Sequence, residues 1–307
     1  MKILRVSIII IMFLVGASTL ILYSFYEYNN KEKKALTDVE RKNIDGKFIK
    51  LSQGITHYQL EGPENGEVVI LVHGFSVPYY IWDGTYEFLV KNGYRVLRYD
   101  MYGRGYSDRP ATVYNKNLYN TQLLDLIAAL KLQGHVNLAG ISFGGEMITN
   151  FACQHPGIIN KVILIDPAYE SLKPSAPRYF TLYNEAVNSN KRAKGQLNDF
   201  LYPKKHPEWI KHYLPQMEYK GFRHALVSTM YDYDQHGRQS NICLNNANKP
   251  VLLIWGEKDG TVPFRFSDSI RSVLKVDFFP VAGAAHLPSV EKPDTVNNKI
   301  LSFLKQG

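Results

Sequence analysis

The chain has 307 residues, 45% of them hydrophobic, and a formal net charge of +8. This size allows a large buried core and fits one α/β domain with an insertion, or two smaller domains. The basic residues are scattered and no zinc-finger, basic-heptad or RNP-like motif occurs, which argues against nucleic-acid binding and leaves a solvated surface or attraction to anionic lipid.

The N-terminal segment 1–26 predicts a membrane anchor. Lys2 and Arg5 precede an apolar run of 18 residues, Val6 to Tyr23. As a helix this run would extend about 27 Å, close to the hydrocarbon thickness of a bilayer. We therefore expect a membrane-anchored protein of the cell envelope, with its domain on the periplasmic side.

A cleaved signal peptide is the competing interpretation of this segment. Val15-Gly16-Ala17 could form a small-residue cleavage site, and the protein would then be secreted. The apolar run continues through Leu22, beyond the length of a typical signal sequence, and this favours the uncleaved anchor. A polar tether follows at 27–46.

From Lys47 onward, strand and helix patterns alternate. A strand pair (KFIKLSQ and ITHYQLEG) comes first. The next expected elements are strands at 67–74 and 94–100, a helix at 118–132, the strand HVNLAGIS, a helix at 144–155, strands at 161–167 and 250–260, a helix near 263–274, a strand at 275–280 and a helix near 293–305. This alternation predicts an α/β fold with a mostly parallel sheet and helices on both faces.

One region interrupts the alternation. Residues 171–248 are rich in Tyr, Lys, Asn and Pro and contain no strong strand signal, so we expect an inserted helical cap. The core would then have a first part at 47–170 and a second part at 249–307. The two cysteines have no metal-binding spacing; Cys153 fits a buried apolar helix position, and no disulfide framework is implied.

The segment GISFGG at 140–145 has the pattern of a nucleophile elbow. Gly-x-Ser-x-Gly between a strand and a helix holds Ser142 in a strained turn at the carboxyl end of the sheet, where ligands bind in such folds. Gly140 and Gly144 flank it because a Cβ atom would crowd the turn. The helix beginning near Phe143 directs its positive end toward developing negative charge.

A serine nucleophile requires a base, and His286 is the best placed of the nine histidines. It lies in the loop AGAAHLPSVEKP after the last strand, at the sheet edge of the elbow. His73 ends a strand and could reach the site, and His57 lies in an early strand. The others are at the far end of the sheet (His135, His155) or in the cap (His206, His212, His224, His236).

The base in turn needs an orienting acid, and Asp259 in the loop WGEKDGTVP is our first assignment. The order Ser142, Asp259, His286 matches the chain order of this type of hydrolase. Asp166 is the alternative acid. Asp100 is expected to brace the loop MYGRGYSDRP through backbone hydrogen bonds.

The backbone N–H groups of Phe143 and Phe75 are the expected oxyanion donors. Phe143 follows the nucleophile, and Phe75 follows Gly74, which lets the backbone approach a substrate. Phe75 could also serve as a hydrophobic wall.

Five motifs together resemble the α/β-hydrolase superfamily over about residues 47–305: HGF, DMYGRGYSDRP, GISFGG, WGEKDGTVP and AGAAHLPSVEKP. The similarity is greatest to the capped branch of monoacylglycerol-lipase-like esterases, meta-cleavage-product hydrolases and cofactor-free haloperoxidases. The resemblance implies a serine hydrolase that acts through Ser142, Asp259 and His286 without metal or organic cofactor. Relatives that act on haloalkanes or epoxides have Asp at the nucleophile position, which Ser142 argues against.

The expected reaction is hydrolysis of a carboxylic ester through an acyl-enzyme. A small-molecule, lipid-like substrate such as a monoacylglycerol or lysophospholipid fits a basic, aromatic cap beside a membrane; the cap aromatics could equally pack its own core. Carbon–carbon bond or thioester hydrolysis is the alternative chemistry. A ligand sensor that retains the triad is the alternative from another class.

Overall fold

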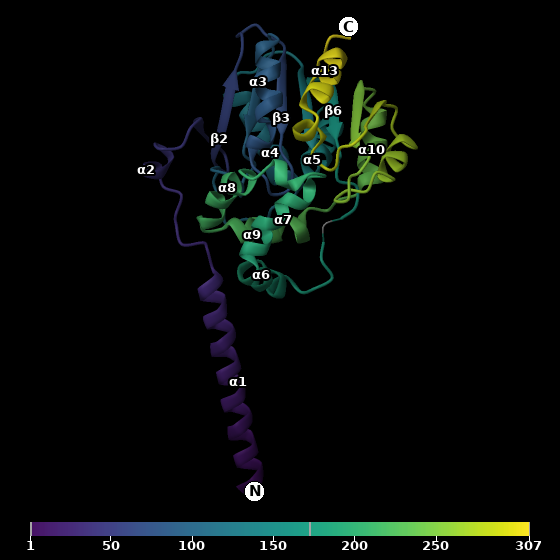
Figure 1. Ribbon diagram of the computed structural model, residues 1–307. Coiled ribbons are helices and arrows are strands. Elements are labelled where there is room, and N and C mark those ends of the chain that lie inside the picture. The colour runs from purple at the N-terminus through teal and green to yellow at the C-terminus, as the bar shows by residue number, and fades with distance from the viewer. Residues whose placement is uncertain (1, 172, 307) are drawn as a thin grey trace.

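The computed structural model describes residues 2–171 and 173–306. A long helix, α1 (Lys2–Asn29), projects from a layered domain (Figure 1). It is long and apolar enough to cross a membrane, and its apolar stretch is not buried against the domain. Signal sequences satisfy the same criterion, so membrane attachment stays a proposal.

The domain is built on one eight-stranded sheet of order β1-β2-β4-β3-β5-β6-β7-β8. β2 is antiparallel to β1 and β4, and the remaining pairs are parallel. The strands are β1 (Lys47–Leu51), β2 (Gly54–Glu61), β3 (Val68–Val72), β4 (Arg95–Tyr99), β5 (Val136–Ile141), β6 (Ile159–Ile165), β7 (Val251–Gly256) and β8 (Asp277–Val281). The mostly parallel sheet predicted from the alternation is confirmed.

Alternating side chains of the central strands supply two cores, one on each face. In β3, Ile70 and Val72 pack in one core, whereas Val69 and Leu71 pack in the other. All four are fully buried, which explains why this strand is a continuous apolar run. The helices outside the cap are α2 (Asp38–Arg41), α3 (Asp83–Lys91), α4 (Lys116–Ala129), α5 (Phe143–Gln154), α11 (Phe266–Arg271), α12 (Pro288–Glu291) and α13 (Pro293–Leu304).

The segment between β6 and β7 is helical, as its composition suggests. It contains α6 (Arg178–Val187), α7 (Ser189–Gly195), α8 (Trp209–Tyr213), α9 (Phe222–Asp232) and α10 (Gly237–Asn246). The first four lie together at the carboxyl end of the sheet (Figure 1). α10 instead packs against α5. We propose that the cap ends before α10 and that this helix belongs to the core. Short 3₁₀ turns are η1 (Tyr79–Trp82), η2 (Pro156–Ile158), η3 (Gln196–Asp199), η4 (Pro203–Lys205) and η5 (Leu214–Glu218).

Cys153 of α5 and Cys243 of α10 form a disulfide, with Cα atoms 5.5 Å apart. The expectation that Cys153 is only a buried apolar side chain was therefore wrong. The two cysteines are 90 positions apart in the chain, so the sequence near either one gives no sign of the pairing. Only the packing of α10 on α5 brings them within the usual Cα separation of disulfides.

Candidate functional site

Ser142 occupies a sharp turn between β5 and α5. Its backbone angles are φ 55° and ψ −124°, in a region that residues with a side chain rarely adopt. A Cβ atom on Gly140 would lie 2.5 Å from the Gly144 carbonyl oxygen, and one on Gly144 would lie 2.3 Å from the His73 carbonyl oxygen. The glycines therefore permit the turn for the steric reason that the sequence indicates.

Backbone hydrogen bonds hold the turn from both sides. The Ser142 N–H donates to the Ile165 carbonyl at 2.9 Å, and the Ser142 carbonyl accepts from Ala168 N–H at 2.9 Å. β6 and the segment after it thus fix the backbone of the serine, so the strain cannot relax by movement of the turn.

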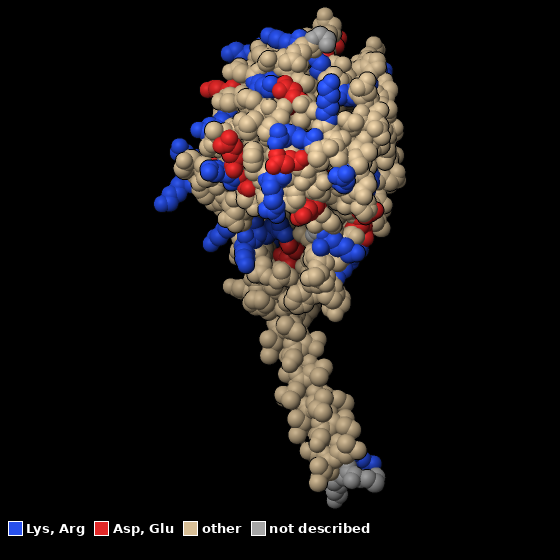
Figure 2. Space-filling view, turned by 90° about the vertical axis from the view of Figure 1, so that its right-hand side faces the viewer, with Lys and Arg blue, Asp and Glu red and all other residues tan. Residues whose placement is uncertain are grey.

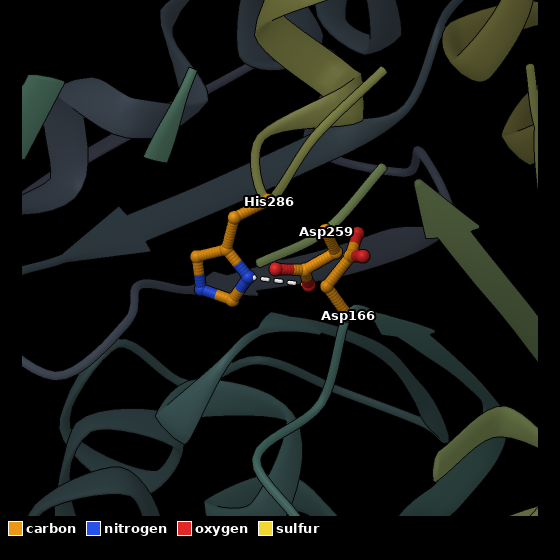
Figure 3. Close-up of side chains that lie close together, drawn as sticks. All are labelled: Asp166, Asp259 and His286. Atoms are coloured by element: carbon orange, nitrogen blue, oxygen red, sulfur yellow. Dashed lines mark hydrogen bonds and ion pairs between the residues drawn. The ribbon is translucent and has the colours of Figure 1, made fainter. Parts of the chain in front are cut away.

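His286 and Asp259 form a buried pair in loops that follow neighbouring strands. The distance between His286 Nδ1 and Asp259 Oδ2 is 2.8 Å (Figure 3). Asp259 Oδ1 accepts the backbone N–H groups of Thr261 and Val262 at 2.8 and 2.9 Å. These bonds fix the carboxylate, and the carboxylate in turn fixes the orientation of the ring.

The pKa of His286 is raised above its ordinary value of 6.5 by a balance of opposed effects. Burial is the largest effect and lowers the pKa. The Asp259 charge, the hydrogen bond to Asp259 and the Asp199 charge together outweigh burial. Asp259 therefore stabilises the protonated ring, as a general base requires once it has taken up a proton.

Asp166 lies beside this pair, and its side chain points toward that of Asp259 (Figure 3). It has a φ of 42°, is fully buried, and accepts the Gly256 N–H on Oδ1 at 2.9 Å. Burial raises its pKa well above the ordinary value, and the Asp259 carboxylate and its hydrogen bond add to this rise. Both effects favour the protonated form of Asp166 over that of Asp259, and a protonated Asp166 can donate to the Asp259 carboxylate.

Asp166, Asp259 and His286 also have the composition of a metal-binding cluster, with one potential ligand atom from each within 4.8 Å of the others. However, Asp259 Oδ1 and Oδ2 and Asp166 Oδ1 already have protein partners. Three of the four carboxylate oxygens are therefore engaged by protein groups, and Asp166 Oδ2 has no hydrogen-bond partner among the residues described.

Ser142 and His286 line the same cavity, which has a volume of about 550 Å³. This is in the range that holds a small organic ligand. Its apolar lining residues come mainly from the core (Phe75, Val77, Ile81, Phe143, Val262, Leu287). Most of its polar lining residues come from the cap segment that contains α6, α7 and η3 (Asn184, Glu185, Asn188, Lys191, Arg192, Gln196, Asn198, Asp199).

Phe75 and Phe143 both line this cavity beside Ser142. Phe143 is the first residue of α5, and a Cβ atom on Gly74 would lie only 3.4 Å from Ser142 Cβ, so the Phe75 segment passes close to the serine. Arg104, for which the sequence predicted no role, is fully buried and donates from Nε to the Phe75 carbonyl at 2.8 Å. Its only sequence signal is its place in the loop after β4.

Two other histidines, His73 and His57, are buried and hydrogen-bonded within the fold. His73 is buried, with Nδ1 2.8 Å from the Gly74 carbonyl and Nε2 accepting the Met101 N–H at 2.9 Å. Burial lowers its pKa to about 4. His57 pairs with Asp100, which accepts backbone N–H groups from Tyr79 and Tyr106. The predicted bracing role of Asp100 is confirmed.

Comparison with known proteins identifies one matching family and several similar proteins. A family model described as alpha/beta hydrolase fold matches residues 67–293. The AB hydrolase superfamily protein YisY of Bacillus subtilis is 23% identical, over 84% of this chain and 98% of its own. The carboxylesterase YbfK of the same organism is 25% identical, over 85% of this chain and 88% of its own.

Among solved structures, a thermophilic esterase from Thermogutta terrifontis superimposes with a TM-score of 0.73 at 22% identity. The match covers 85% of this chain and 99% of that protein. At this identity the similarity demonstrates the fold alone.

Proposed function

Because the chain belongs to the α/β-hydrolase fold family, we propose that it is a serine hydrolase that cleaves carboxylic esters. The observation that carries the proposal is the His286–Asp259 pair. Its histidine lines the same cavity as Ser142, which lies in a strained elbow. Ser142 is the nucleophile, His286 the general base and Asp259 the orienting acid.

The reaction proceeds in two steps. Ser142 Oγ attacks the ester carbonyl while His286 Nε2 takes the hydroxyl proton, and the same proton then passes to the departing alcohol. Water next attacks the acyl-enzyme, with His286 again accepting a proton and returning it to Ser142. Asp259 keeps Nδ1 protonated, so that Nε2 presents its lone pair to the serine.

The negative charge on the carbonyl oxygen requires donors that are already in position. The N–H groups of Phe143 and Phe75 fit this role because both residues line the cavity beside Ser142. Arg104 supports this arrangement by donating to the Phe75 carbonyl, which restrains the backbone of the residue whose N–H is the proposed donor.

The mixed lining of the cavity favours an amphipathic ester. Its apolar side chains suit an acyl chain, whereas the amide and charged side chains of the cap suit a polar head group. A monoacylglycerol or lysophospholipid combines both parts, and α1 would keep the enzyme beside such lipids.

We place the catalytic domain outside the cytoplasm, anchored by α1. The Cys153–Cys243 disulfide supports this location, because such bonds persist in oxidising compartments. Labelling of intact cells with a membrane-impermeant thiol reagent after mild reduction tests it: labelling of the two cysteines is expected, and protection until lysis would contradict the assignment.

Labelling of the full-length protein with a fluorophosphonate probe tests the catalytic proposal. Wild type should react and hydrolyse p-nitrophenyl esters and monoacylglycerols, whereas Ser142→Ala should do neither while remaining folded. Equal labelling of both proteins would eliminate Ser142 as the nucleophile. A wild type that binds monoacylglycerol but neither reacts nor turns over would favour the ligand sensor.

A further inference from the structure

The segment that leaves α1 is held on the cap and is not a free tether. Glu32 accepts hydrogen bonds from the Gly221 N–H and from Nε of Arg223, and the Arg223–Glu32 side chains are only 13% and 10% exposed. Further along, Lys34 N–H donates to the Glu218 carbonyl at 2.9 Å. The junction between anchor and domain is therefore fixed by buried ionic and backbone contacts.

The last turns of α1 also contact α6 of the cap directly (Figure 1). Tyr183 Oη donates to the Leu22 carbonyl at 3.2 Å, and the Tyr183 and Tyr26 rings stack with centroids 6.2 Å apart. Ser189 Oγ donates to the Asn29 carbonyl at 3.1 Å. These contacts fix the level of α6 along the axis of α1.

With α1 across a bilayer, as proposed above, that level coincides with the edge of the hydrocarbon core. A hydrocarbon core of about 30 Å takes about 20 helical residues. Counted from Ile3 they end at Leu22, and counted from Val6 they end at Phe25. In either case the boundary falls within the turns of α1 that contact Tyr183 and α6.

The surface at this level has the composition of a membrane interface. On α6, Tyr179 and Phe180 are 76% and 55% exposed, and they lie one turn before Tyr183 on the same helix. Tyr23 and Tyr28 of α1 are also exposed, and aromatic residues of this kind concentrate at the boundary between lipid and water.

The distribution of charge also fits a membrane interface at this level. Figure 2 shows an uncharged neck where the helix meets the domain, with Lys and Arg side chains gathered just above it. Residues 171–248 contain eleven Lys and Arg against six Asp and Glu. A segment with this excess of positive charge suits a surface of anionic lipids.

From these contacts we propose that α6 lies in the interfacial layer of the bilayer crossed by α1, with Tyr179 and Phe180 inserted among the lipids. The next turn of α6 contributes Asn184 to the catalytic cavity, and Asn188 at the C-cap of this helix also lines it, so the proposed position of α6 puts the cavity close to the lipid surface. An ester then passes from the membrane along α6 to Ser142 without crossing bulk water. This last step rests on the proposed hydrolase function, whereas the position of α6 does not.

Fluorescence quenching in vesicles tests the position of α6. Both natural cysteines are in the disulfide, so a single added cysteine can carry an NBD label in the full chain. The vesicles contain phosphatidylcholine, phosphatidylglycerol and a lipid with a nitroxide on its acyl chain. We expect the label at Phe180→Cys to shift to the blue and to be quenched several-fold more than the matched label at Leu124→Cys on α4. Equal, weak quenching at the two positions would overturn the docking.

Kinetics test the path of the substrate. The double variant Tyr179→Ser/Phe180→Ser should raise KM several-fold for a monoacylglycerol in vesicles and leave kcat/KM for a soluble acetate ester unchanged. An unchanged KM for the vesicle substrate would overturn the path. If the wild type hydrolysed neither ester, the proposed function would fail, and the quenching result would still decide whether α6 is docked.

Discussion

The domain contains two buried histidine–aspartate pairs that have the same distance between Nδ1 and the carboxylate but different surroundings. His57 with Asp100, and His286 with Asp259, each place Nδ1 2.8 Å from a carboxylate oxygen. All four side chains are almost completely buried. Neither the separation of the pair nor its burial therefore identifies a catalytic base.

The second ring nitrogen separates the two pairs. His57 Nε2 is 2.7 Å from the Asp45 carbonyl oxygen, and its ring stacks on Phe48 and Tyr79. His286 Nε2 has no hydrogen-bond partner among residues 2–171 and 173–306, and the residue lines the cavity with Ser142. Only His286 therefore presents a nitrogen that can take a proton from a nucleophile.

Removal of the His286 ring should impair catalysis, whereas removal of the His57 ring should impair stability. The loss of activity in the His286 variant is the largest effect that we predict. We expect His286→Ala to lower kcat for a p-nitrophenyl ester by about 10⁴- to 10⁶-fold, because the serine loses its base. His236→Ala changes an exposed cap histidine and serves as the matched control, with kcat near wild type. A His286→Ala enzyme within tenfold of wild type would mean that another group activates Ser142.

The next effect distinguishes Asp259 from its neighbour Asp166. Asp259→Asn should lower kcat by about 10⁴-fold, because the amide no longer holds the ring in the required tautomer. Asp166→Asn should cost less than about tenfold, because an amide can still donate to Asp259. Steady-state kinetics on both variants test this difference, and the reverse order would make Asp166 the orienting acid.

Replacement of His57 should affect stability instead of chemistry. His57→Ala leaves the buried Asp100 carboxylate without its ring partner, and we expect a loss of about 3 kcal/mol in the free energy of unfolding. Urea denaturation measures the loss, and kcat per folded molecule should stay near wild type. A loss of kcat comparable to that of His286→Ala would show that the two pairs do not differ in role.

Local patterns were sufficient to predict much of this architecture. The glycines around Ser142 signal the elbow because a Cβ atom there would meet backbone. The order of the strands places the loops of Asp259 and His286 at the same edge, and the alternation of strands and helices predicts the sheet. Each inference depends on residues close together in the chain or on the topology of parallel strands.

Contacts between distant residues escaped prediction. The disulfide joins two helices whose packing has no periodic signal, and Glu32 meets Arg223 across 191 positions. The proximity of Asp166 to Asp259 likewise depends on how far each carboxylate reaches from adjacent strands. Such contacts follow from the final packing, which neither residue spacing nor composition specifies.

The smallest predicted effect concerns the pH dependence that the His286 environment imposes. The base acts when neutral, so kcat/KM should rise with pH through the pKa of His286, above the ordinary value of 6.5. The Asp199 charge is the weakest of the three effects that raise this pKa. Asp199→Asn should therefore move the acidic limb to lower pH, and by less than Asp259→Asn does on its residual activity.

Asp234→Asn removes a mostly exposed carboxylate of the cap and serves as the control, with an unchanged profile. A limb that moved to higher pH in Asp199→Asn would have the wrong sign for the loss of a negative charge beside His286. The group titrating in kcat/KM would then be some other residue. His286 and His57 would still differ in the partners of Nε2. The proposed electrostatic support of the His286 ring by Asp199 would be refuted.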